Sequence, residues 1–115
     1  MLGWLRARLS RRPVVPVVRL SGVIASSGGL LGSRGLNIET VAPLLKRAFE
    51  MRNARAVALA INSPGGSPVQ SALIGQRIRL LAREKNLKVI AFVEDVAASG
   101  GYWLACAADD RARID

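Results

Sequence analysis

The sequence predicts an α/β fold in which crossover helices connect the strands of a parallel β-sheet. Three short apolar segments, at 14–20, 56–61 and 88–93, have the length and the β-branched or small residues typical of buried strands. Segments with apolar residues at helical spacing separate them, so strands and helices alternate along the chain. This alternation favours parallel strands joined by right-handed connections.

The first predicted strand, at 14–20, is marked by Pro13 and Pro16, which favour a position at the edge of the sheet. The Gly/Ser-rich stretch at 21–35 is predicted to be a loop. A helix follows, with Asn37 as its N-cap and apolar residues at helical spacing from Ile38. The later predicted elements are a strand at 56–61, a turn at 62–68, a helix at 69–84, a strand at 88–93, a turn at 94–98, a helix from Ser99 to Ala108 and a strand at 111–114.

The charge of the chain is strongly basic but unevenly distributed. The formal net charge is +9, and every charged residue before Glu39 is an arginine. Nucleic-acid binders combine a basic face with interleaved aromatic residues, whereas aromatic residues make up only 4% of this chain. We therefore expect no nucleic-acid partner.

Histidine is absent, and Cys106 is the single cysteine. This composition excludes a Ser-His-Asp site, a Cys-His site and a disulfide within the chain, and it disfavours zinc. The phosphate-binding patterns GxxxxGK[ST] and GxGxxG are also missing. We expect no cofactor and no metal, and we expect Cys106 to face the core.

Residues 1–12 are predicted to form a basic tail ahead of a domain at 13–115. Leu2, Leu5 and Leu9 fall on one side of a short amphipathic helix, a pattern that suits a membrane surface. A solvated, frayed tail and an organellar transit segment are the alternatives. The apolar runs of the chain fall short of the roughly 20 residues that a transmembrane helix needs.

A dense cluster of turn residues, INSPGGSP, follows the predicted strand at 56–61. Two consecutive glycines, Gly65 and Gly66, permit backbone conformations closed to other residues and present bare N–H groups. Such donors stabilise an oxyanion or hold a phosphate. The alternative is a plain tight turn between a strand and a helix.

The next predicted strand leads into DVAASGGYWLACAAD. Ser99 follows a short turn and opens a helix, with two glycines behind it, so its hydroxyl is expected to be exposed on a tight bend. The N–H of Gly100 and the helix N-terminus would favour a developing oxyanion beside it. The alternative is that Ser99 is only an N-cap and the glycines allow close helix packing.

Together, SPGG after one strand and AASGGY after the next resemble the signal peptide peptidase A family of serine peptidases, including its SohB-like members. The resemblance extends from about Val14 to the chain end and includes PVVRLSGVI. It implies a ClpP/crotonase-like fold, with Ser99 as the nucleophile that forms an acyl-enzyme. The N–H groups of Gly66 and Gly100 would form the oxyanion hole, and Gly65 would shape the loop.

The family activates its serine with a lysine, which must lose its proton near neutral pH in a desolvated site. Lys46, Lys85 and Lys88 are instead predicted to be solvated surface residues. In the short, single-domain family members the lysine comes well after the serine, which here means beyond Asp115. We therefore expect an incomplete domain, the N-terminal half of such a peptidase, whose general base lysine is not in this chain.

The predicted function is that of a serine endopeptidase of the Ser/Lys type, which cleaves signal-peptide or other membrane-associated peptide remnants. A non-catalytic scaffold or binding module of the same fold is the alternative. The resemblance implies peptide substrates and a homo-oligomer at full length, and the basic N-terminus predicts peripheral membrane contact. We expect the protein in the cytoplasm or on the inner membrane surface, with Val69 and the loop at 21–35 as candidate substrate contacts.

Overall fold

The computed structural model describes residues 12–26, 35–97 and 100–113. Four strands form one sheet in the order β1-β2-β3-β4, and each strand is parallel to its neighbour. The α/β fold with a parallel sheet and crossover helices is therefore confirmed. The elements are β1 (Val17–Ser21), α2 (Ile38–Phe49), β2 (Ala56–Ser63), α3 (Pro68–Lys85), β3 (Lys88–Ala97), α4 (Gly100–Cys106) and β4 (Asp110–Arg113).

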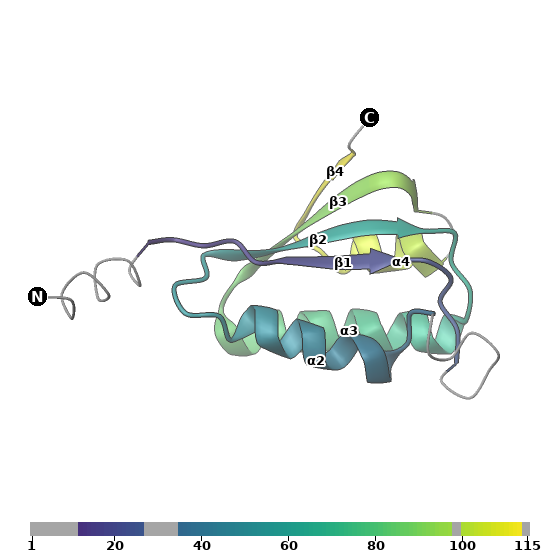
Figure 1. The fold of residues 1–115 in the computed structure, drawn as a ribbon, viewed down its shortest axis with the longest axis horizontal. Coiled ribbons are helices and arrows are strands. Elements are labelled where there is room, and N and C mark those ends of the chain that lie inside the picture. Colours follow the sequence, from purple (N-terminus) through teal and green to yellow (C-terminus); the bar gives the residue numbers. More distant parts are fainter. Residues whose placement is uncertain (1–11, 27–34, 98–99, 114–115) are drawn as a thin grey trace, which may run out of the picture.

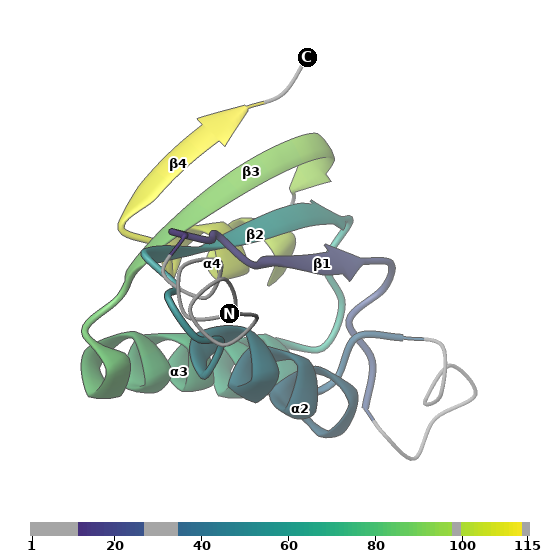
Figure 2. The same cartoon turned by 60° about the vertical axis from the view of Figure 1, so that its left-hand side comes forward.

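All three helices lie on the same side of the sheet (Figures 1 and 2). Successive right-handed crossovers between neighbouring parallel strands place each connecting helix on the same face. The hydrophobic core fills the space between this face and the helices, and the central strand β2 contributes Val57, Leu59 and Ile61, all fully buried. Ile74 and Ile78 of α3 close the core from below.

The helix ends follow local capping chemistry. Asn37 is the N-cap of α2, as predicted, and forms a reciprocal capping box with Thr40. Ser67 caps α3, whose first residue, Pro68, needs no N–H donor at that position. The C-cap of α3 is Asn86, which adopts the left-handed conformation with φ 52°.

Two predicted boundaries after β2 are wrong. β3 continues to Ala97, through most of the turn predicted at 94–98, because Ser63 of β2 still pairs with Ala97 after a register irregularity. Helix α4 ends at Cys106 instead of Ala108, and a turn leads from it directly into β4. Polar residues such as Glu94 hid the end of the strand from a prediction based on apolar runs.

Candidate active site

The two loops that the sequence singles out meet at the carboxyl edge of the sheet. The loop at 64–67 leaves β2, and the start of α4 follows β3. A Cβ added to Gly100 would lie 3.4 Å from the Cα of Gly65 and would clash with Ser71 Oγ. A Cβ on Gly101 would clash with the carbonyl oxygen of Ser63. The glycines of α4 therefore allow the two loops to pack directly against each other.

Gly65 and Gly66 both adopt positive φ angles, of 102° and 144°. Side chains with a Cβ rarely adopt this backbone conformation. At Gly66 the restriction is also steric, since an added Cβ would clash with the carbonyl oxygen of Ile24. The predicted need for glycines in this loop thus has two separate physical causes.

The chain segment 22–26 supports the glycine loop from the side. Ile24 donates its N–H to the carbonyl of Gly65 at 2.9 Å, and its own carbonyl accepts the N–H of Ser67 at 2.7 Å. These two hydrogen bonds form a parallel bridge opposite Gly66. Leu36 bridges the other side of Ile24. The described part of the predicted loop at 21–35 is therefore a short, strand-like segment, while 27–34 lies outside the described residues.

This bridge determines the direction of the Gly66 N–H. Because the Gly65 carbonyl and the Ser67 N–H both face Ile24, the N–H of the residue between them faces away from that segment. No acceptor among the described residues binds it, and Gly66 is exposed. An oxyanion hole requires a donor of this kind, fixed in place and without an internal partner.

Ser63 is a member of this site that sequence reasoning missed. It is fully buried; its hydroxyl donates to the carbonyl of Gly22 at 2.6 Å and accepts the N–H of Gly65 at 3.1 Å. One side chain thus connects the end of β2 to both the segment at 22–26 and the glycine loop. The only signal in the sequence was a serine two residues before a glycine pair, a pattern that favours local side-chain to backbone bonds.

Ser99, the predicted nucleophile, lies outside the described residues, together with residue 98. Its chain neighbour Gly100 is buried and opens α4. Of the four predicted site residues, the structure thus brings together Gly65, Gly66 and Gly100. The role of each remains a prediction.

The lysines of the described chain have no place in this site. Lys46, Lys85 and Lys88 are all exposed, as predicted. Lys88 opens β3 at the amino edge of the sheet and lies 3.0 Å from the carboxylate of Asp110. The hydrogen bond that Lys88 donates to the carboxylate of Asp110 raises the pKa of Lys88, which is the opposite of what a lysine base requires.

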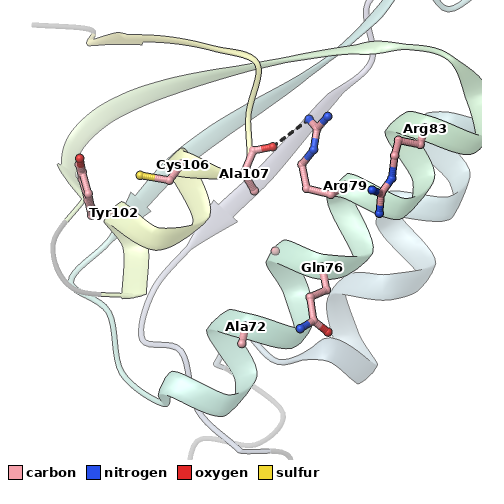
Figure 3. A pocket seen from close by; sticks show the side chains of 8 residues that line it. Ala72, Gln76, Arg79, Arg83, Tyr102, Cys106 and Ala107 are labelled. Atoms are coloured by element: carbon pink, nitrogen blue, oxygen red, sulfur yellow. Dashed lines mark hydrogen bonds between the residues drawn. The ribbon is translucent and has the colours of Figure 1, made fainter.

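An open groove of about 580 Å³ lies between α3 and α4, away from the glycine loop. Arg79, Arg83, Tyr102 and Cys106 are among its lining residues (Figure 3). Cys106 is exposed, so the expectation that it faces the core is wrong: at the last position of a seven-residue helix it turns outward, where its sulfur accepts a hydrogen bond from Arg111 at 3.2 Å. Tyr102 is exposed as well.

Asp109 is exposed, but its hydrogen bonds connect the edge of the sheet to α3. Its carboxylate accepts the backbone N–H of Val89 at 2.8 Å. Arg79 of α3 donates to the same carboxylate at 3.3 Å and to the carbonyl of Ala107 at 3.1 Å, a bond drawn in Figure 3. The Val89 N–H, and then the charge and hydrogen bond of Arg79, lower the pKa of Asp109.

Two negative findings hold for the described part of the chain. No group of three or more Cys, Asp or Glu side chains there is arranged to hold a metal ion. Within the same residues, no helix is both long enough and apolar enough to span a bilayer.

Comparison with known proteins shows which proteins this chain is similar to. Residues 81–113 match the family model of peptidase family S49. The chain is also similar in shape to the 1510-N membrane-bound stomatin-specific protease, with a TM-score of 0.65 over 89% of this chain and 44% of that one. At 22% identity this second likeness supports the fold alone.

Two of the relatives are proteases and agree with the peptidase class. The chloroplastic serine protease SPPA of Arabidopsis thaliana is 35% identical over 92% of this chain, and protease 4 of Haemophilus influenzae is 35% identical over 83%. The resemblance to the signal peptide peptidase A family is therefore confirmed. A Na(+)/H(+) antiporter NhaA of Brucella melitensis is 54% identical over 84% of this chain. The chain spans only 16%, 15% and 13% of the lengths of these three relatives, respectively.

Proposed function

We propose that this chain carries the nucleophile and the oxyanion hole of a serine peptidase of the Ser/Lys type. The observation that carries the proposal is the N–H of the exposed residue Gly66, which has no acceptor among the described residues and belongs to a loop that packs against Gly100 through Gly65. The proteases among the relatives support the same reaction class.

In the proposed reaction, the hydroxyl oxygen of Ser99 attacks the carbonyl carbon of a peptide bond and loses its proton to the base. The carbonyl oxygen becomes an oxyanion that accepts the N–H groups of Gly66 and Gly100. The N–H of Gly100 is suited to this task because the first N–H groups of a helix have no intrahelical acceptor. Collapse of the intermediate releases the amine, which takes the proton, and leaves an acyl-enzyme that water hydrolyses.

The general base is proposed to be a lysine from outside these 115 residues. Lys46, Lys85 and Lys88 are exposed, and the pKa of Lys88 is raised. On this proposal, the domain at 13–115 is the N-terminal half of the peptidase and 1–12 is a basic tail. The rest of a longer chain or a second subunit would supply the missing base.

Extended peptides are the proposed substrates, including signal-peptide and other membrane-associated remnants. A relative from Enterococcus faecium, 31% identical, is described as a putative signal peptide peptidase. Val69, at the start of α3 beside the glycine loop, is 67% exposed and offers an apolar contact. A homo-oligomer at full length, without nucleic acid, and peripheral attachment to the inner membrane surface through the basic N-terminus complete the proposal.

The test uses the natural full-length protein that contains this segment. Ser99→Ala is expected to abolish the cleavage of a fluorogenic peptide and labelling by a serine-directed fluorophosphonate, because the attacking oxygen is removed. The matched control is Ser21→Ala, which removes an exposed hydroxyl from the end of β1. Undiminished turnover in Ser99→Ala would refute the proposal.

The second candidate function is a non-catalytic scaffold or binding module. It is favoured by the absence of a buried lysine from the described residues. The intact mass of the protein isolated from its source separates the two candidates. A mass near 12.3 kDa, that of this chain alone, together with no fluorophosphonate labelling, would favour the scaffold.

A further inference from the structure

One face of the sheet faces away from all the helices. Buried and exposed residues alternate along β1, with Val18 and Leu20 in the core and Val17 and Arg19 on the opposite side. Among the described residues, no helix or strand covers this second face, which Figure 2 shows above the layer of helices. We call it the open face.

The strand register identifies the residues of the open face on β2 and β3. Val17 pairs with Ala58, which pairs with Ile90; Arg19 pairs with Ala60, which pairs with Phe92. Val57, Leu59, Val89 and Ala91, which alternate with these residues, belong to the core, whereas Ile90 and Phe92 do not. Ala58 and Ala60 at the centre of the open face are themselves buried, with 4% and 7% of their surface exposed. The apolar surface there is therefore made by the partly exposed side chains of Ile90 and Phe92, with the exposed Val17 at the edge.

Charged residues lie at the two ends of this surface. At the carboxyl end, Glu94 of β3 forms an ion pair with Arg19 at 3.2 Å. At the amino end, Lys88 of β3 forms an ion pair with Asp110 of β4 at 3.0 Å. Along β3 alone, the open face presents a cation, two apolar side chains and an anion, in that order.

This order is self-complementary. If two β3 strands cross face to face in opposite directions, the cation of each lies over the anion of the other, and the two apolar residues lie over each other. An isologous dimer requires a surface that matches itself in this way. Two sheets that pack face to face lie about 10 Å apart with their strands within about 30° of each other, which leaves room for the Ile90 and Phe92 side chains to interdigitate.

We propose that the open face binds a second copy of this chain. A two-fold axis passes near Ala91, at the midpoint of the β3 pattern. Ile90 of each copy packs on Phe92 of the other, and Lys88 of each copy pairs with Glu94 of the other. The existing ion pairs with Arg19 and Asp110 become part of four-charge networks at the two ends of the interface.

The first test measures the dimer dissociation constant of the 115-residue chain by sedimentation equilibrium. Lys88→Glu or Glu94→Lys alone is expected to weaken the dimer about tenfold, because each reversal places like charges together twice per dimer. The double variant Lys88→Glu/Glu94→Lys is expected to bind more tightly than either single variant but less tightly than the parent, since the contacts between copies are restored with exchanged signs while the pairs with Asp110 and Arg19 within each copy become like-charged. Circular dichroism verifies that each variant is folded.

The matched control is a pair of reversals, Glu84→Lys and Lys85→Glu, on the exposed end of α3. These changes are expected to leave the dissociation constant unchanged. A folded parent chain that stays monomeric at 100 times the protein concentration used for circular dichroism would overturn the proposal. So would a dimer that tolerates both single reversals on β3, because that dimer would use another surface.

The second test examines the register in a Cys106→Ser background. One chain carries Ile90→Cys, another carries Phe92→Cys, and a bismaleimide that spans about 10 Å joins thiols across the interface. A mixture of the two chains is expected to give more cross-linked dimer than either chain alone. Equal yields from all three samples would contradict the antiparallel arrangement. Thiols that stay unreactive in a monomeric, longer protein would show that another segment of that protein covers the face.

Discussion

At the scale of single residues, the hydroxyl of Ser63 holds the glycine loop of the candidate site in position. It is fully buried between the carbonyl of Gly22 and the N–H of Gly65 and has hydrogen bonds to both. The Gly66 N–H points outward only while this loop keeps its position against Ile24. A residue that touches no substrate would thus decide where the proposed oxyanion donor lies.

Ser63→Ala is expected to lower the free energy of unfolding of the chain by about 1–3 kcal/mol, since it leaves the N–H of the buried Gly65 without a partner and removes the hydrogen bond to the Gly22 carbonyl. Urea denaturation measures this loss. Ser21→Ala, an exposed serine of β1, is the matched control and is expected to change stability by less than about 0.5 kcal/mol. Equal effects of the two substitutions would show that the hydrogen bonds of Ser63 add nothing.

The difference between Gly65-Gly66 and Ser63 shows what the sequence reveals at this scale. The special backbone of the glycine pair was predictable because consecutive glycines permit conformations closed to other residues, and the structure places both residues at positive φ. Ser63 was not predictable, because a serine in a turn has many local acceptors and only the fold brings Gly22, 41 positions away, within reach. Long-range partners of polar side chains are set by topology and not by local pattern.

At the scale of elements, Asp109 connects β3, α3 and β4. Its backbone N–H donates to the carbonyl of Val89 of β3, and its carboxylate accepts the N–H of the same residue. The carboxylate also accepts a hydrogen bond from Arg79 of α3, and β4 begins at the next residue. The sequence predicted a strand at 111–114, so it placed the start of β4 one residue late. The bond from Val89 to the exposed Asp109 was not predictable, because nothing in an Asp-Asp pair indicates that one carboxylate bonds to another strand. Strand and helix interiors were predicted well, and the connections that fix their ends were not.

The contribution of Asp109 to stability is expected to depend on pH. Its pKa is lower in the folded chain than in the unfolded chain, so its stabilising effect is complete above the unfolded pKa and is lost as the pH falls through the folded pKa. Asp109→Asn keeps an acceptor for the Val89 N–H but removes the charge opposite Arg79. The melting temperature of the parent is thus expected to exceed that of the variant at pH 7, with the difference shrinking below about pH 4. A difference that stays constant from pH 7 to pH 3 would exclude this linkage.

At the scale of the whole molecule, the chain has two layers, with a single core between one sheet face and the helices. Leu59 lies at the centre of that core, fully buried on the central strand, whereas Leu80 on α3 is 45% exposed. Leu59→Ala is expected to cost about 2–5 kcal/mol of unfolding free energy, because it creates a cavity where the sheet and helices meet. Leu80→Ala is expected to cost less than about 1 kcal/mol, since its side chain is already half hydrated and alanine is the better helix former.

Urea denaturation of both variants distinguishes two arrangements. In the first, the main core lies between the sheet and the helices; in the second, the outer surface of the helices is buried in a larger assembly. In the second case Leu80→Ala would approach the cost of Leu59→Ala, and the difference would depend on protein concentration. Concentration-independent values with a gap of at least 1 kcal/mol would place the core on the helical side of the sheet. The open face would then remain the sheet surface available for the proposed dimer, at the opposite side of β2 from the core.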